Sequence, residues 1–183
     1  RTIKEPKVSF LTYFTFPNQG GKAIKTECIL DQNRVGICTS ISNVEMVFDR
    51  TGVRYSEDFQ YLLQKKYIDK NWYEGSSIFS SVKASYDYGY LKKEIFDQYF
   101  QRNPNEDYNS YSKRLQGIAN NEDLMKDLLS QCEKALQGYT KLSVNLPDIA
   151  KAIDDTDNGV LVRYTCGWSW FYKLINGITR NCW

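Results

Sequence analysis

The order of the periodic segments limits the fold more than any other feature of this sequence. Between residues 36 and 154, apolar side chains recur at three- and four-residue spacing, which is the period of an amphipathic helix. The later segments 159–164 (GVLVRY) and 170–175 (WFYKLI) are short and rich in β-branched and aromatic residues, which is typical of strands. Helices that come first and strands that come last predict an α+β protein in which the two kinds of structure occupy separate lobes.

The chain length sets the scale of this fold. With 183 residues, of which 42% are hydrophobic and 25% charged, the sequence is typical of one globular domain. We therefore predict a single domain over residues 1–183. Its mainly helical lobe covers 1–115, and its crossing helices and incomplete antiparallel β lobe cover 116–183.

Capping signals place the individual helices. Ser56 is a good N-cap because two acidic residues follow it in the positive first turn, and Gly52 and Gly89 are suited to ending a helix. In the helix before Gly89, four apolar side chains are predicted to face inward: Ile78, Phe79, Val82 and Tyr86. The complete set of predicted helices runs from 36 to 51, from 56 to 67, from 75 to 89, from 121 to 136 and from 146 to 154, with a polar loop over 100–113.

Charge and cysteine usage exclude several classes of function. Lys and Arg number 24 and Asp and Glu number 22, and this balance predicts neither a nucleic-acid nor a membrane partner. The five cysteines form no C-x-x-C pair, so we expect no metal site, and we expect no cofactor. Because five is an odd number, at least one thiol remains unpaired.

One of these thiols is placed for chemistry. Cys38 falls in the first turn of the helix predicted from residue 36, and a helix N-terminus lowers the pKa of a thiol and so favours the nucleophilic thiolate. Gln32 lies six residues earlier, and its amide is able to donate a hydrogen bond to a developing oxyanion. The alternative, from periodicity alone, is that Cys38 is a small hydrophobic residue of the helix core.

Several ordered segments are similar to the papain family of cysteine peptidases. Gln32 and Cys38, within Asp31-Gln32 and Gly36-Ile37-Cys38, keep the interval of the family's D-Q-G-x-C-G-S-C-W element. Further along, the matching segments are Tyr55-Ser56-Glu57-Asp58 (L-S-E-Q), Gly75-Ser76-Ser77 (G-G), Ala152-Ile153 with Gly159-Val160-Leu161-Val162 (A-I … G-P-V-S-V), and Gly177-Ile178 (G-I-Y). The similarity covers most of residues 5–182 and implies the papain-like form of the α+β fold.

The resemblance implies a role for each matched position. Cys38 would be acylated by an extended peptide or protein substrate, and Gln32 would donate to the oxyanion. The residues implied to bind substrate are Gly75 and Ser76, as a backbone edge, and Ile78 and Val160, beside the pocket for its second residue. The alternatives are that residues 75–76 only start a helix and that Ile78 and Val160 only pack in the core.

The departures from the family pattern limit what this chain is expected to do. It contains no histidine, Val35 replaces a disulfide cysteine, Thr39 replaces a tryptophan, and Ser76 replaces a glycine. Without an imidazole to take up the thiol proton, we expect the isolated chain to be inactive. Because it starts with Arg and stops just before the family's histidine is due, we expect it to be part of a longer peptidase.

Two other hypotheses remain open from the sequence. The first is a papain-like module that binds peptides or has a structural role without turnover, within a larger assembly such as a phage or virus particle. The absence of the family's disulfide positions and of N-x-S/T sites favours an intracellular or virion-associated location. The second is a helical domain unrelated to papain, which predicts that Cys38 is buried away from any groove and far from Gln32.

Overall fold

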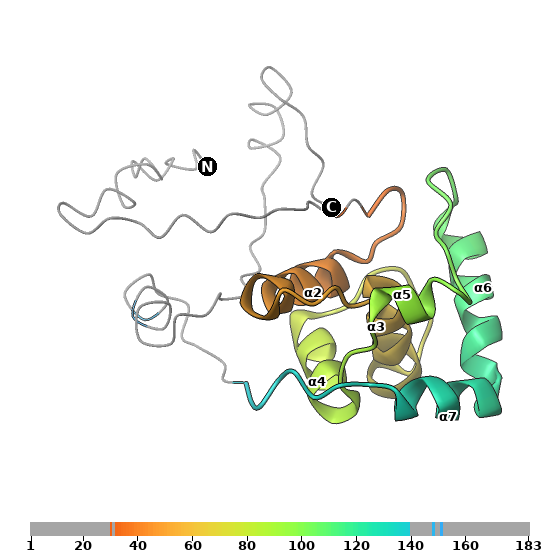
Figure 1. The fold of residues 1–183 in the computed structure, drawn as a ribbon. Coiled ribbons are helices and arrows are strands. Elements are labelled where there is room, and N and C mark those ends of the chain that lie inside the picture. The colour runs from red at the N-terminus through yellow and green to blue at the C-terminus, as the bar shows by residue number, and fades with distance from the viewer. Residues whose placement is uncertain (1–29, 31, 140–147, 149–150, 152–183) are drawn as a thin grey trace, which may run out of the picture.

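The computed structural model describes residues 30, 32–139, 148 and 151, and residues 32–139 form a helical body (Figure 1). Its elements follow one another without long connections except before α6. They are α2 (Cys38–Thr51), α3 (Glu57–Leu63), the π-helix η1 (Gln64–Asp69), α4 (Ile78–Tyr88), α5 (Lys93–Phe96), α6 (Tyr108–Asn120) and α7 (Glu122–Ser130).

The predicted α+β architecture with a β lobe is wrong for the part of the chain that the structure describes. That part is helical and contains no strand or sheet. Its extended backbone is limited to two isolated antiparallel bridges, Tyr55 with Lys92 and Tyr90 with Glu133. Helical periodicity therefore determines the architecture here. The segments predicted as strands, 159–164 and 170–175, lie outside the described residues, as does most of the helix predicted over 146–154.

The capping signals are confirmed where they were strongest. The Ser56 hydroxyl accepts the N–H of Phe59 at 3.1 Å and starts α3. Gly52 and Gly89 follow α2 and α4 with φ values of 69° and 87°, which favour glycine.

The boundaries in the second half differ from the prediction. Within the predicted loop over 100–113, Asp107 caps α6 by accepting the N–H of Ser110 at 3.0 Å. The helix predicted over 121–136 ends at Ser130, because the chain there turns into the extended bridge at Glu133. The polar composition of 100–113 hid the cap at Asp107, and the end of α7 depends on the bridge from Glu133 to the distant Tyr90.

The core lies where α2, α3 and α4 meet, and α6 packs against α3 from one side (Figure 1). Phe59, Leu62 and Leu63 of α3 are fully buried at its centre. The prediction for α4 is wrong in part, because Phe79 and Tyr86 are 60% and 44% exposed. The face that α4 turns inward carries alanine and serine instead: Ser80, Ser81, Ala84 and Ser85. Asn43, Gln60 and Gln64 meet this face with hydrogen bonds, which a row of large apolar side chains does not accept.

Membrane-spanning helices and metal-binding clusters are both absent from the described ranges. No helix there combines the length and apolar character that crossing a bilayer requires. The same ranges contain no group of three or more His, Cys, Asp or Glu side chains that could hold a metal ion.

Candidate functional site

The thiol of Cys38 lies on the surface at the first residue of α2. Ile37 and Ile41 are buried, and their helical spacing leaves Cys38 facing outward. Ile37 caps the helix without a side-chain hydrogen bond, and within the described ranges the backbone N–H groups of Cys38 and Thr39 have no acceptor. The thiol therefore lies beside unpaired donors at the positive end of a helix, where negative charge is stabilised. The hypothesis of a buried, purely hydrophobic Cys38 is wrong.

Gln32 opens the turn that leads into α2. Its backbone carbonyl accepts the N–H of Val35 at 3.3 Å, and Asn33 takes the left-handed conformation with φ 55°. Val35 is buried and anchors this turn to the core. The side-chain Oε1 of Gln32 is buried and, among the residues that the structure describes, has no hydrogen-bond partner. The structure thus places the amide in the turn before Cys38, without a hydrogen bond between the two side chains.

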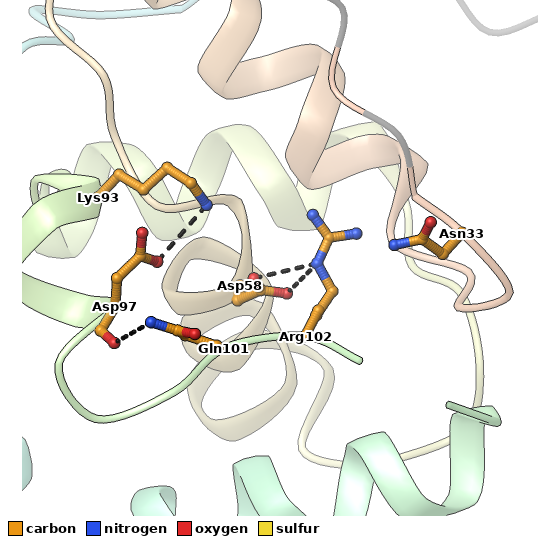
Figure 2. A pocket seen from close by; sticks show the side chains of 6 residues that line it. All are labelled: Asn33, Asp58, Lys93, Asp97, Gln101 and Arg102. Carbon is orange, nitrogen blue, oxygen red and sulfur yellow. Dashed lines mark hydrogen bonds and ion pairs between the residues drawn. The ribbon is translucent and has the colours of Figure 1, made fainter. Parts of the chain in front are cut away.

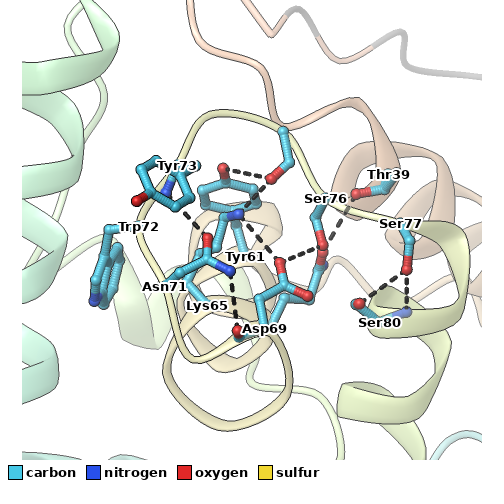
Figure 3. A network of polar contacts seen from close by, with 12 residues as sticks. Thr39, Tyr61, Lys65, Asp69, Asn71, Trp72, Tyr73, Ser76, Ser77 and Ser80 are labelled. Carbon is cyan, nitrogen blue, oxygen red and sulfur yellow. Dashed lines mark hydrogen bonds and ion pairs between the residues drawn. The ribbon is translucent and has the colours of Figure 1, made fainter.

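Figure 3 shows the loop that carries Ser76, beside Tyr61, Lys65 and Asp69. Gly75 has φ 81°, and its carbonyl accepts hydrogen bonds from the hydroxyl of Tyr61 and from the ammonium of Lys65. The hydroxyl of Ser76 donates to Asp69 at 2.8 Å. In contrast, the backbone N–H and C=O of Ser76 have no hydrogen-bond partner within residues 32–139. This is the type of edge with which an extended peptide pairs.

The turn before Cys38 and the loop at Gly75 are in direct contact. The N–H of Gly36 donates to Oε1 of Glu74 at 3.0 Å, and a Cβ on Gly36 would lie 2.8 Å from Cγ of Glu74. One helical turn further on, the hydroxyl of Ser81 in α4 donates to the carbonyl of Thr39 at 3.1 Å. Two of the predicted site segments, some 38 positions apart, therefore lie side by side.

A buried polar layer holds α2 in this position. Asn43 of α2 donates to the hydroxyls of Ser81 and Ser85 at 3.0 and 2.7 Å and accepts from the hydroxyl of Tyr90 at 3.0 Å. Gln64 of η1 donates to the hydroxyl of Ser40 at 2.8 Å. These bonds have few alternative geometries, so they define the rotation of α2 more strictly than apolar contacts do.

The other two predicted site residues, Ile78 and Val160, do not take part in the contact between Gly36 and Glu74 as far as the structure describes it. Ile78 is half-buried as the first residue of α4, directly after the Ser77 N-cap. Val160 lies outside the described residues. The structure thus brings together the segments of Cys38, Gln32, Gly75 and Ser76.

Sequence reasoning missed a second charged site at the start of α3 (Figure 2). Asp58 accepts from Arg102 Nε at 3.1 Å and from the Tyr111 hydroxyl at 2.8 Å, while Glu57 pairs with Lys93 at 3.0 Å and also with Arg102. The cavity beside them has a volume of about 240 Å³ and is lined by Asn33, Asp58, Lys93, Asp97, Gln101 and Arg102. The acidic pair signalled a helix start in the sequence, but nothing local indicated its distant cations.

Burial and ion pairing shift the pKa values of Asp58 and Glu57 in opposite directions. Burial raises the pKa of Asp58 to about 6, although Arg102 opposes the shift. Burial also acts to raise the pKa of Glu57, but Lys93, Arg102 and its backbone N–H outweigh it and hold that pKa below its usual range. Of these two carboxyl groups, Asp58 therefore has the higher pKa.

Comparisons of this chain with protein-family models, with curated proteins and with solved structures find no match. The function of the chain is therefore inferred from the geometry of the site itself.

Proposed function

We propose that this chain is the nucleophile-bearing part of a papain-like cysteine peptidase, with Cys38 as the acylated thiol and an extended peptide as substrate. The contact between the turn that presents Cys38 and the loop that presents Ser76 is the observation that supports this most. A peptide laid across it would pair its backbone with Ser76 while one of its carbonyl carbons meets the exposed thiol.

In the proposed reaction, the Cys38 thiolate attacks the carbonyl carbon of a peptide bond, and an electron pair of the C=O bond moves to the oxygen. The backbone N–H of Cys38 and the amide of Gln32 donate hydrogen bonds to this oxyanion. Its collapse breaks the C–N bond, leaves the acyl group on sulfur as a thioester, and releases the amine after its nitrogen gains a proton. Water then hydrolyses the thioester to a carboxylic acid and restores the thiol.

The proton carrier for these steps is an imidazole supplied from outside these 183 residues, which contain no histidine. It takes the thiol proton and later gives it to the leaving amine. Removing one member of such a catalytic unit loses nearly all of the rate, so the chain by itself is expected to bind peptides without cleaving them.

The proposal is tested by alkylation of single cysteines, followed by mass spectrometry. The alkylation rate of Cys38 is measured with a peptidyl epoxide and with iodoacetamide, and the first rate is divided by the second. The same quotient is measured for free glutathione, which corrects for the intrinsic reactivity of the two reagents. We expect a preference of more than about tenfold for the peptidyl reagent, because one well-placed backbone hydrogen bond is worth about that factor. Equal ratios for Cys38 and glutathione would overturn the proposal.

Cys132 serves as the internal control in the same molecule. It is half-buried, and burial raises the pKa of its thiol to about 12. We therefore expect slow reaction of Cys132 with both reagents and no preference for the peptidyl one, since the thiolate is the reactive form.

A second function, peptide binding without turnover, is favoured by the absence of histidine from the chain. The two functions are separated by a peptide-hydrolysis assay on the protein isolated with its natural flanking sequence and partners. A peptidase loses hydrolysis in the Cys38→Ala variant. A binding module shows no hydrolysis in either form and keeps its affinity for the peptide in Cys38→Ala.

A further inference from the structure

Lys65 is a buried lysine directly beneath the Gly75–Ser76 loop (Figure 3). Its side chain is 2% exposed, and it lies in η1, one turn before Asp69. The ammonium donates to Oδ2 of Asp69 at 3.1 Å and to the carbonyl of Gly75. Burying an ammonium group costs free energy unless such partners surround it, so the buried position of Lys65 depends on Asp69 and on the Gly75 carbonyl.

The bond to the Gly75 carbonyl defines the orientation of the next amide group. The peptide bonds of the described part are all trans, and in a planar trans peptide the C=O and the following N–H point in opposite directions. Because Lys65 and Tyr61 hold the Gly75 carbonyl inward, the N–H of Ser76 points away from them. This N–H has no acceptor within the described ranges.

The side chain of Ser76 is held inward as well. Its hydroxyl donates to the same Asp69 oxygen that pairs with Lys65. Gly75 gives the loop the left-handed conformation that this arrangement needs, with φ 81°. Both inward-facing groups of the loop thus depend on one ion pair, between the buried Lys65 and the half-buried Asp69, and the outward-facing group is the backbone donor that has no acceptor within the described ranges.

We propose that Lys65 is a positioning residue: through the Gly75 carbonyl it aims the N–H of Ser76 at the backbone of a peptide bound next to Cys38. This inference rests on the proposed function. Lys65 does not touch the substrate in this scheme. Its role is to reduce the number of orientations of the donor before the peptide arrives, which lowers the cost of binding.

The test measures saturable labelling of Cys38 by the peptidyl epoxide, which separates binding (KI) from the chemical step (kinact). Lys65→Met is the direct variant. Lys65→Met/Asp69→Asn removes both charges together, so that no lone buried charge is left to unfold the domain. The matched control is Lys83→Met/Asp87→Asn, which removes a Lys–Asp pair of the same spacing from the surface of α4.

We expect KI for the peptidyl epoxide to rise about tenfold in both Lys65 variants, the equivalent of one lost hydrogen bond, with kinact and the iodoacetamide rate unchanged. The Lys83→Met/Asp87→Asn variant should keep the KI of the wild type. A folded double variant, judged by its helical circular dichroism, with wild-type KI would overturn the inference and leave the proposed function intact. If the wild type shows no preference for the peptidyl reagent, the proposed function and this inference fail together.

Discussion

Gly36 and Glu74 are in contact at the point where the turn before Cys38 meets the loop before Ser76. The N–H of Gly36 donates to Oε1 of Glu74 at 3.0 Å, and a side chain at position 36 would collide with Cγ of Glu74. This contact joins the segment that carries the thiol to the segment that carries the unpaired backbone edge, so it is the first place at which to test the site.

We expect Gly36→Ala to displace the Glu74 side chain and break its hydrogen bond. Because Glu74 is exposed and flexible, the free energy of unfolding should fall by only about 1 kcal/mol, measured by urea denaturation. Gly117→Ala is the control, since Gly117 lies in α6 with no atom within 4 Å of an added Cβ. That change should stabilise the protein by about 0.5–1 kcal/mol. A larger loss in Gly117→Ala than in Gly36→Ala would contradict the assignment of the contact.

Asn43→Ala should remove the main connection between α2 and α4. Asn43 is fully buried and hydrogen-bonds to Ser81, Ser85 and Tyr90, whose polar groups would be left without it. We expect the free energy of unfolding to fall by about 2–4 kcal/mol. The exposed Asn120 is the control, because Asn120→Ala should change stability by less than about 0.5 kcal/mol. Equal decreases in the free energy of unfolding for Asn43→Ala and Asn120→Ala would show that the hydrogen bonds of Asn43 do not stabilise the fold.

Arg102→Met should strongly destabilise the domain. The side chain of Arg102 is 10% exposed and pairs with Glu57 and Asp58, which are 1% and 4% exposed. Removing Arg102 leaves the buried Asp58 carboxylate without its cation, at a cost of about 3–5 kcal/mol, whereas Glu57 keeps Lys93. The exposed Arg114, 42% exposed and paired with Glu106, offers the comparison, and Arg114→Met should cost less than about 1 kcal/mol. Thermal and urea unfolding of both variants measure the difference.

Asp58 should make stability depend on pH in the weakly acidic range. Burial raises its pKa from 3.8 to about 6 in the folded protein, so the folded state binds a proton that the unfolded state has already released. The contribution of Asp58 to stability therefore falls as the pH rises from about 4 to about 6. The free energy of unfolding of the wild type minus that of Asp58→Asn should decrease over this interval.

The control for this titration is Asp107→Asn. Hydrogen bonds from Ser110 lower the pKa of Asp107 below 3.8, so its carboxyl is ionised in both states above about pH 5. The corresponding difference in unfolding free energy should therefore rise slightly or stay flat between about pH 4 and about pH 6, and should not fall. A difference for Asp58→Asn that rises with pH would show that Arg102 outweighs burial at this carboxyl.

Local interactions explain which parts of the fold were predictable. The cap at Ser56 joins atoms three residues apart, and the end of α2 at Gly52 depends on one residue's conformational freedom. Such interactions are present in any short window of sequence. The same applies to the place of Cys38 at the start of α2, which the apolar spacing of Ile37 and Ile41 predicted.

Long-range pairing explains what was missed. Arg102 finds Glu57 over 45 positions, and Asn43 meets Ser81 over 38, so neither partner is visible in a local pattern. The inward face of α4 was predicted from its apolar residues, yet Ser81 and Ser85 occupy it because Asn43 supplies hydrogen bonds there.

By itself, the sequence determined where α2 and α3 begin and that Cys38 stands at the first of these starts. Only the tertiary structure decided that the thiol is exposed, that its turn contacts the loop at Gly75, and that Lys65 is buried with the Gly75 carbonyl. The physical reason is that helix formation depends on neighbours along the chain. Burial of a polar group depends instead on partners that folding brings from elsewhere.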